Sequence, residues 1–166
     1  MTVVCTDIVG STSMADALGD QRWRTVLQAH YAMARGEVAR HGGTEVKTRG
    51  DGLLLIFNSP RRAVHFAVSF QEALEKERAT DPDFDIEVRV GVHAGEVERD
   101  GADVVGRNVS VACRLCDAAA PGEILASAIV ADLADSASDL AFGPARELAL
   151  AGIERPIRAH SATSRD

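Results

Sequence analysis

The chain has 166 residues, with 18 Lys and Arg against 25 Asp and Glu, and a formal net charge of −7. Its composition, 46% hydrophobic and 26% charged residues, is typical of a globular chain and not of a disordered one. An acidic chain without a basic run is not expected to bind nucleic acid or an anionic membrane surface. No apolar run reaches the roughly 20 residues that a membrane span needs.

The N-terminal region predicts one strand and two helices. A strand over residues 3–7 is followed by the turn Gly10-Ser11-Thr12-Ser13. Ser13 to Asp16 matches a capping box, which predicts a helix that begins near Met14 and is interrupted at Gly19. A longer helix follows and ends at His41-Gly42-Gly43. Its expected apolar stripe is Trp23, Leu27, Tyr31, Ala34 and Val38.

The middle of the chain predicts a hairpin, a helix and a strand. Strands over 44–48 and 53–57 are joined by Arg49-Gly50-Asp51-Gly52, which is typical of a hairpin turn. Pro60 favours the first turn of a further helix. Residues 86–92 alternate between apolar and polar side chains, which indicates a strand with one buried face.

The C-terminal half carries weaker signals. Residues 96–106 are polar, with a turn at Gly101. A helix is predicted over 108–119, a short strand over 123–126 and a short helix near 129–133. Two or three short strands are expected up to about residue 160.

This order predicts an α+β fold. The β-α-β-β-α-β succession favours a ferredoxin-like core, with helices on one face of a mainly antiparallel sheet and a C-terminal α/β extension. We expect residues 1–166 to form a single domain. Because a strand begins almost at the first residue, we also expect the domain to be cut from a longer chain.

The three cysteines predict no metal site and no disulfide. Their odd number, without disulfide spacing, suits a reducing compartment, so we expect a cytoplasmic location. Cys113 and Cys116 have C-x-x-C spacing, but a zinc site needs a second pair, and no strand leads into the motif as in a thioredoxin-like site. We interpret both as small residues on a helix.

Two aspartates are candidate metal ligands. Asp7 ends the first strand beside a Gly-Ser-Thr turn whose backbone N–H groups form a natural phosphate site, and Mg²⁺ joins carboxylates to phosphate oxygens. Asp7 fits equally well as a cap of that turn, and the Asp51-Gly52 turn needs no function. The first strand and the hairpin are usually neighbours in such a core, so Asp7 and Asp51 are expected to converge on one or two metal ions.

Several segments carry a family resemblance. They are Cys5–Thr12, Glu45–Gly52, Arg89–Glu96, Asp103–Gly106 and Val109–Leu115. In this order they resemble the class III nucleotidyl cyclases, and in particular the bacterial adenylyl cyclases of the mycobacterial type. The resemblance covers about residues 2–160 and implies one catalytic domain over 1–166.

The resemblance implies formation of a cyclic nucleotide from a nucleoside triphosphate, with release of pyrophosphate, at sites shared by a homodimer. One protomer would hold two Mg²⁺ or Mn²⁺ ions through Asp7, Asp51 and the carbonyl of Ile8. The same protomer would bind the phosphates of ATP through Gly10, Ser11, Thr12 and Arg89.

The resemblance assigns the other half of each site to the partner protomer. Lys47 and Asp103 would read the base, and Arg114 would stabilise the transition state together with Ser110, at the place of the family's Asn. Adenine offers an acceptor at N1 and a donor at N6, which suits a donor-only Lys and an acceptor-only Asp. Guanine inverts this pattern and would favour an acceptor in place of Lys47.

Two departures from the family pattern keep other hypotheses open. Ser110 is shorter than Asn, Asn108 would not share its helix face, and Ala151 stands where many relatives carry a phosphate-binding Lys. A catalytically weak domain that binds nucleotide or dimerises for regulation is therefore an alternative. A guanylyl cyclase is a third hypothesis. A polymerase-like or diguanylate-forming enzyme is a fourth, and it gives no reason for Lys47 and Asp103.

Overall fold

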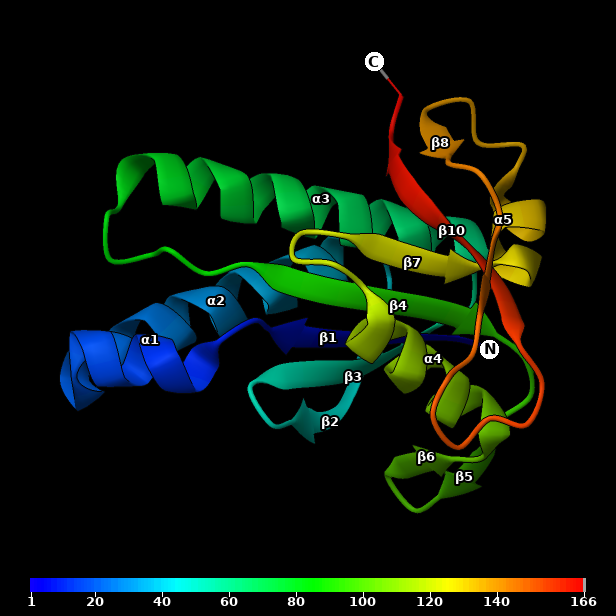
Figure 1. Cartoon of the computed structure of the whole chain (residues 1–166), viewed down its shortest axis with the longest axis horizontal. Coiled ribbons are helices and arrows are strands. Elements are labelled where there is room, and N and C mark those ends of the chain that lie inside the picture. Colours follow the sequence, from blue (N-terminus) through cyan, green and yellow to red (C-terminus); the bar gives the residue numbers. More distant parts are fainter. Residues whose placement is uncertain (166) are drawn as a thin grey trace.

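Strand β1 (Thr2–Ile8) lies in the interior of a mixed sheet in the computed structural model, which describes residues 1–165 (Figure 1). It pairs antiparallel with β3 (Gly52–Phe57) on one side and with β4 (Val88–Ala94) on the other. The sheet order is β2-β3-β1-β4-β7-β10-β8, with β9 paired to β10. The β4–β7 pair is parallel, and the other pairs described in this sheet are antiparallel.

The remaining elements follow the expected order, which confirms the α+β class and the mainly antiparallel sheet. The other strands of the sheet are β2 (Thr44–Arg49), β7 (Ile124–Ser127), β8 (Leu140–Phe142), β9 (Arg146–Leu148) and β10 (Ile157–Ser164). A separate hairpin consists of β5 (Glu98–Asp100) and β6 (Asp103–Val105). The helices are α1 (Ser11–Leu18), α2 (Asp20–Arg40), α3 (Pro60–Thr80), α4 (Arg107–Ala118) and α5 (Ala128–Ala134).

The two faces of the sheet have different coverings. Alternate residues of β1 and β3, such as Val4 and Leu55, join the large core under α2 and α3. The residues between them, such as Cys5 and Leu54, pack against α4. Figure 1 shows α4 crossing in front of β4. The two long core helices thus share one face as expected, whereas α4 of the extension covers the other; we call this second side the α4 face.

Two glycines allow the backbone to approach closely on the α4 face. A Cβ atom at Gly52 would lie 1.7 Å from the carbonyl oxygen of Thr6 and 3.1 Å from the Cα atom of Asp7. A Cβ atom at Gly91 would lie 2.3 Å from the carbonyl oxygen of Ala112 in α4. Side chains cannot occupy these positions without moving the backbone. The hairpin is therefore held against the end of β1, and α4 is held against β4.

The structure differs from the expectations at several boundaries. α1 begins at Ser11 and not near Met14, because Gly10 takes a left-handed conformation with φ 66° and is the N-cap itself. The strand expected from residue 86 begins at Val88. The polar stretch 96–106 contains the β5–β6 hairpin, which its short three-residue strands did not signal. None of the helices in residues 1–165 is long and apolar enough to cross a membrane.

The buried stripe of α2 is also shifted from the expected one. Its buried residues are Val26, His30, Ala34 and Val38, whereas Trp23, Leu27 and Tyr31 are only partly buried. His30 packs against the rings of Tyr31 and Phe70. Neither of its ring nitrogens has a hydrogen-bond partner among the described residues. A polar histidine at a core position was not predicted from the apolar pattern.

We expect Gly52→Ala to destabilise the protein, because its methyl group would collide with the Thr6 carbonyl. The free energy of unfolding should fall by about 1–3 kcal/mol, measured by urea denaturation. Gly36→Ala is the matched control, since Gly36 lies inside α2 with no atom within 4 Å of an added Cβ. That control should gain about 0.5–1 kcal/mol. Equal effects of the two substitutions would contradict the close approach at Gly52.

We also expect stability to fall in acid because of His30. Burial lowers the pKa of His30 from 6.5 to about 4, while Asp51 raises it and Arg35 lowers it further. The unfolded chain therefore binds more protons between these pH values. The free energy of unfolding should then decrease as pH falls from about 6.5 to 4, by up to roughly 3 kcal/mol. His30→Phe should flatten this pH profile, as measured by urea denaturation at several pH values. A smaller slope should remain, because burial also lowers the pKa of His93. An unchanged slope in His30→Phe would contradict the role of His30.

Candidate active site

Asp7 and Arg89 are direct neighbours on the α4 face. They are paired in the β1–β4 register and form an ion pair between Asp7 Oδ2 and Arg89 Nη2. Arg89 Nη1 also donates to the backbone carbonyl of Asp117, at 3.0 Å. Arg89 Nε is buried and has no partner among the described residues. The carboxylate predicted to bind metal is thus neutralised by the arginine predicted to bind phosphate.

Asp51 lies at the tip of the β2–β3 hairpin, where the close contact of Gly52 with β1 brings it toward Asp7. Within residues 1–165 no group of three or more His, Cys, Asp or Glu side chains could hold a metal ion. A site here would consist of two carboxylates and the carbonyl of Ile8, completed by water and substrate phosphate. That donor set fits Mg²⁺, which uses one or two carboxylates and seldom a full protein cage.

The turn before α1 presents backbone donors. Gly10 has φ 66°, a conformation that favours glycine, and its carbonyl accepts from the N–H of Met14, 3.0 Å away. The N–H groups of Ser11 and Thr12 belong to the first turn of the helix and have no intrahelical acceptor. They lie at the positive end of α1, where an anion is favoured, and the phosphate site there stays a prediction.

Lys47 and Asp103 meet although 56 residues separate them. Lys47 Nζ of β2 donates to Asp103 Oδ2 of β6 at 2.8 Å, and half of the Lys47 side chain is exposed. The hydrogen bond from Lys47 and a second one from the Val104 N–H hold the pKa of Asp103 below its usual value. The structure brings together the two residues predicted to read the base. Without substrate, they form a hydrogen bond with each other.

Ser110 and Arg114 lie one turn apart on α4. The Ser110 hydroxyl donates to the carbonyl of Gly106, the N-cap of α4, at 3.5 Å. Arg114 Nη1 contacts Asp117 Oδ2 at 3.3 Å, and 47% of its side chain is exposed. Asn108 points elsewhere: its amide group contacts His93 Nε2 and the carbonyl of Glu96. Asn108 is therefore a structural residue and does not replace the family's Asn.

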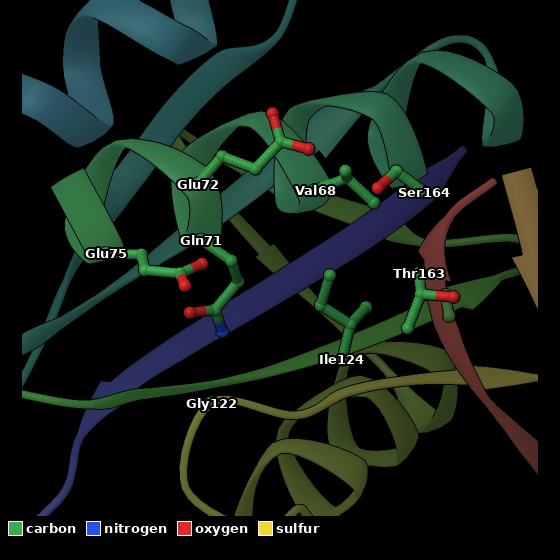
Figure 2. A pocket seen from close by; sticks show the side chains of 9 residues that line it. Val68, Gln71, Glu72, Glu75, Gly122, Ile124, Thr163 and Ser164 are labelled. Atoms are coloured by element: carbon green, nitrogen blue, oxygen red, sulfur yellow. The ribbon is translucent and has the colours of Figure 1, made fainter. Parts of the chain in front are cut away.

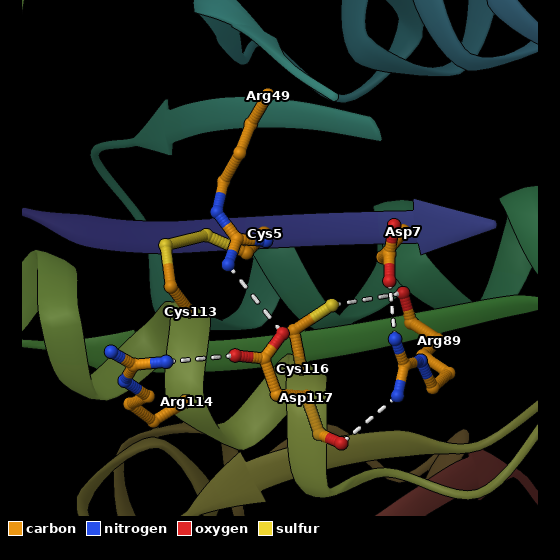
Figure 3. A network of polar contacts seen from close by, with 8 residues as sticks. All are labelled: Cys5, Asp7, Arg49, Arg89, Cys113, Arg114, Cys116 and Asp117. Atoms are coloured by element: carbon orange, nitrogen blue, oxygen red, sulfur yellow. Dashed lines mark hydrogen bonds and ion pairs between the residues drawn. A yellow bond between two sulfur atoms is a disulfide. The ribbon is translucent and has the colours of Figure 1, made fainter. Parts of the chain in front are cut away.

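Two residues next to the site were missed by the sequence analysis. Arg49 extends from β2 toward α4, and its Nη2 lies 3.4 Å from Asp117 Oδ1 (Figure 3). Asp117 is thus contacted by Arg49, Arg89 and Arg114. The alternation of Lys47 and Arg49 along one strand was an available signal for Arg49. Asp117 had no comparable signal in the sequence.

The expectation that no cysteines pair was wrong, because Cys5 and Cys113 form a disulfide in the structure. Their Cα atoms are 5.3 Å apart, within the usual range, because α4 packs directly on β1. A separation of 108 residues hid this pairing from the sequence. Cys116 is free and buried, and its thiol contacts the carbonyl of Arg89.

A pocket on the other face of the sheet lies away from these residues. Figure 2 shows it between α3, β7 and β10, with Gln71, Glu72 and Glu75 on one wall. None of the predicted site residues lines it. Its two glutamates and its lack of any lining cation make it unsuited to a triphosphate. The charged residues on the α4 face are the candidate active site.

Residues 1–160 match the family described as the adenylate and guanylate cyclase catalytic domain. The chain belongs to this family. An uncharacterized protein of Mycobacterium tuberculosis is 33% identical over 153 residues, which are 92% of this chain and 38% of that protein. The cyclase domain thus spans well under half of the length of this relative.

Solved cyclase structures have the same fold. An adenylate/guanylate cyclase/hydrolase from Silicibacter pomeroyi superposes with a TM-score of 0.82 at 26% identity, over 98% of this chain and 95% of that chain. The adenylyl cyclase CyaB from P. aeruginosa gives a TM-score of 0.86 at 22% identity, over 99% and 93%. The guanylyl cyclase Cya2 gives 0.83 at 24%, over 97% and 90%. Because both kinds of cyclase match the fold, the fold does not select the base.

We expect one free thiol, that of Cys116, in the cyclase domain. Burial raises the pKa of the Cys116 thiol to about 12, so it should not react with Ellman's reagent in the native protein at pH 8. In guanidinium without reductant, only Cys116 should react, since Cys5 and Cys113 are joined. After reduction all 3 cysteines should react. Three reactive thiols without reductant would contradict the disulfide.

Proposed function

We propose that this domain is an adenylyl cyclase. It would convert ATP to 3′,5′-cyclic AMP and pyrophosphate, at two sites that are shared across a homodimer. The observation that carries the proposal is the contact of Lys47 with Asp103. Family membership supports cyclase chemistry, and this pair supports the choice of base.

The Lys47–Asp103 pair is complementary to adenine. Lys47 Nζ can donate to adenine N1, and Asp103 can accept from the N6 amine. Guanine would place its O6 acceptor opposite Asp103 and its N1–H donor opposite Lys47, and both groups would be left unsatisfied. Rejection of a mispaired base by polar groups is strong for this reason. The 2.8 Å contact between Lys47 and Asp103 must yield when the base enters.

The phosphate end of the site combines carboxylates and cations. Asp7, Asp51 and the Ile8 carbonyl would hold two Mg²⁺ or Mn²⁺ ions. When bound, such ions activate the ribose 3′-hydroxyl and neutralise the triphosphate. Arg89, now paired with Asp7, would turn toward the phosphates, where the N–H groups of Ser11 and Thr12 also bind. Arg114 would stabilise the negative charge on the α-phosphate in the transition state.

The exposure of the second half of the site supports a dimer. In the isolated chain Lys47 is 50% exposed and Arg114 is 47% exposed. A second copy would exclude water from these groups and strengthen their interaction with substrate. Two-fold symmetry then gives each protomer one half of two identical sites.

A catalytically weak, regulatory domain is the second candidate. The Ser110 hydroxyl is bonded to the N-cap carbonyl of α4, and Ala151, which carries no charge, lies in an exposed turn. Loss of one transition-state donor costs about 10²–10³ in rate. We therefore expect a slow enzyme. A cytoplasmic location follows from ATP as substrate; the cysteines no longer support it, because Cys5 and Cys113 are joined.

We expect the purified domain with Mn²⁺ or Mg²⁺ to form cyclic AMP from ATP and much less cyclic GMP from GTP, as resolved by chromatography. Asp7→Asn should lower the rate at least about 100-fold, because the metal site loses a carboxylate. Asp132→Asn is the matched control, since Asp132 is exposed on α5, and it should retain full activity. No cyclic nucleotide from either substrate at any protein concentration would overturn the proposal, and preference for GTP would overturn its choice of base.

A further inference from the structure

Three arginines from three different elements meet at Asp117, at the C-terminal end of α4 (Figure 3). Arg49 of β2 contacts one carboxylate oxygen at 3.4 Å, and Arg114 of α4 contacts the other at 3.3 Å. Arg89 of β4 reaches the backbone carbonyl of the same residue at 3.0 Å. One side chain thus fixes two guanidinium groups beside each other.

The charges of this group do not cancel. Arg49, Arg89 and Arg114 carry three positive charges, whereas Asp7 and Asp117 carry two negative ones, so one positive charge remains. The contacts of Asp117 are longer than the 2.7–2.9 Å of strong charge-assisted hydrogen bonds. Arg49 is also still 34% exposed. The two guanidinium groups are held in place but retain capacity to bind an anion.

Arg49 lies close to the residues proposed to bind the base and the α-phosphate of a nucleotide. Lys47 and Arg49 alternate along β2 and share one face, so Arg49 lies one step beyond the residue proposed to read the base. Arg114, proposed to act at the α-phosphate, contacts the same carboxylate as Arg49. The ribose and its 5′-phosphate connect base to triphosphate, and Arg49 neighbours both proposed contacts, through β2 on one side and through the Asp117 carboxylate on the other.

We propose that Arg49 is a further substrate-binding residue for the ribose–α-phosphate part of ATP, and that Asp117 is the positioning residue that holds Arg49 and Arg114 together. Arg49 thereby supplies from β2 a cation that the turn at Ala151 lacks. This inference rests on the proposed cyclase function. It assigns both residues a role that the resemblance to the family did not.

Kinetics of the dimeric protein test the proposal. Arg49→Gln should raise KM for ATP about tenfold. Asp117→Asn, which loosens both Arg49 and Arg114, should raise KM several-fold and also lower kcat about tenfold. Arg24→Gln, exposed on α2, and Asp132→Asn are the matched controls and should match the wild type. Asp117→Glu keeps the charge and should retain most of the activity. If Asp117→Asn unfolds, Asp117→Ser takes its place.

A double-mutant cycle separates positioning from a general structural effect. In the Arg114→Gln background, Asp117→Asn should cost less than about a further twofold in kcat, because its partner is already lost. Full, additive losses would overturn the positioning role of Asp117. Unchanged KM in Arg49→Gln would overturn the substrate contact.

An NMR measurement keeps this test distinct from that of cyclase activity. In ¹⁵N spectra of the arginine Nε–H groups, Asp117→Asn should remove the dispersed signals of Arg49 and Arg114, which the wild type should show. Unchanged signals would overturn the positioning role, whatever the kinetics. A wild type that forms no cyclic nucleotide would instead overturn the proposed function and the substrate role of Arg49. The spectra would still show whether Asp117 holds Arg49 and Arg114 in place.

Discussion

The close backbone approach at Gly52 and Gly91 is the constraint on which the α4 face depends. At Gly52 the hairpin touches the β1 backbone beside Asp7, and at Gly91 helix α4 touches β4. The first contact sets the position of Asp51, and the second sets that of Arg114 and Asp117. An added methyl group at either glycine would push a whole element outward, since well-packed backbone has no room to give.

Paired charges occupy the site in the free protein. Lys47 is paired with Asp103, Asp7 with Arg89, and Asp117 with two further arginines. These pairs hold flexible side chains in place, although each exposed pair adds little stability. On the proposed function, substrate binding would exchange these protein partners for groups of the nucleotide. An acidic chain would thus receive a polyanion without a basic patch, because its carboxylates organise the cations.

Most strands of the sheet were predicted from the sequence, but only some of the residue contacts in the candidate site were. Alternating and apolar runs revealed the strands, and the β-α-β-β order placed Asp7 near Asp51. The β5–β6 hairpin was hidden because its strands have only three residues each. The Cys5–Cys113 disulfide and the contacts of Asp117 with Arg49 and Arg89 depend on how α4 lies on the sheet. Local patterns carry no information about such packing.

The shared site is the central claim, and mixing two inactive variants tests it most directly. Asp51→Ala removes a proposed metal ligand from one half of each site, and Lys47→Ala removes a proposed base contact from the other half. A heterodimer of the two should contain one intact site. A one-to-one mixture should therefore regain about a quarter of the wild-type activity, since half of the dimers are mixed and each has one of two sites. No recovery, although native mass spectrometry shows that the subunits have exchanged, would contradict the shared site.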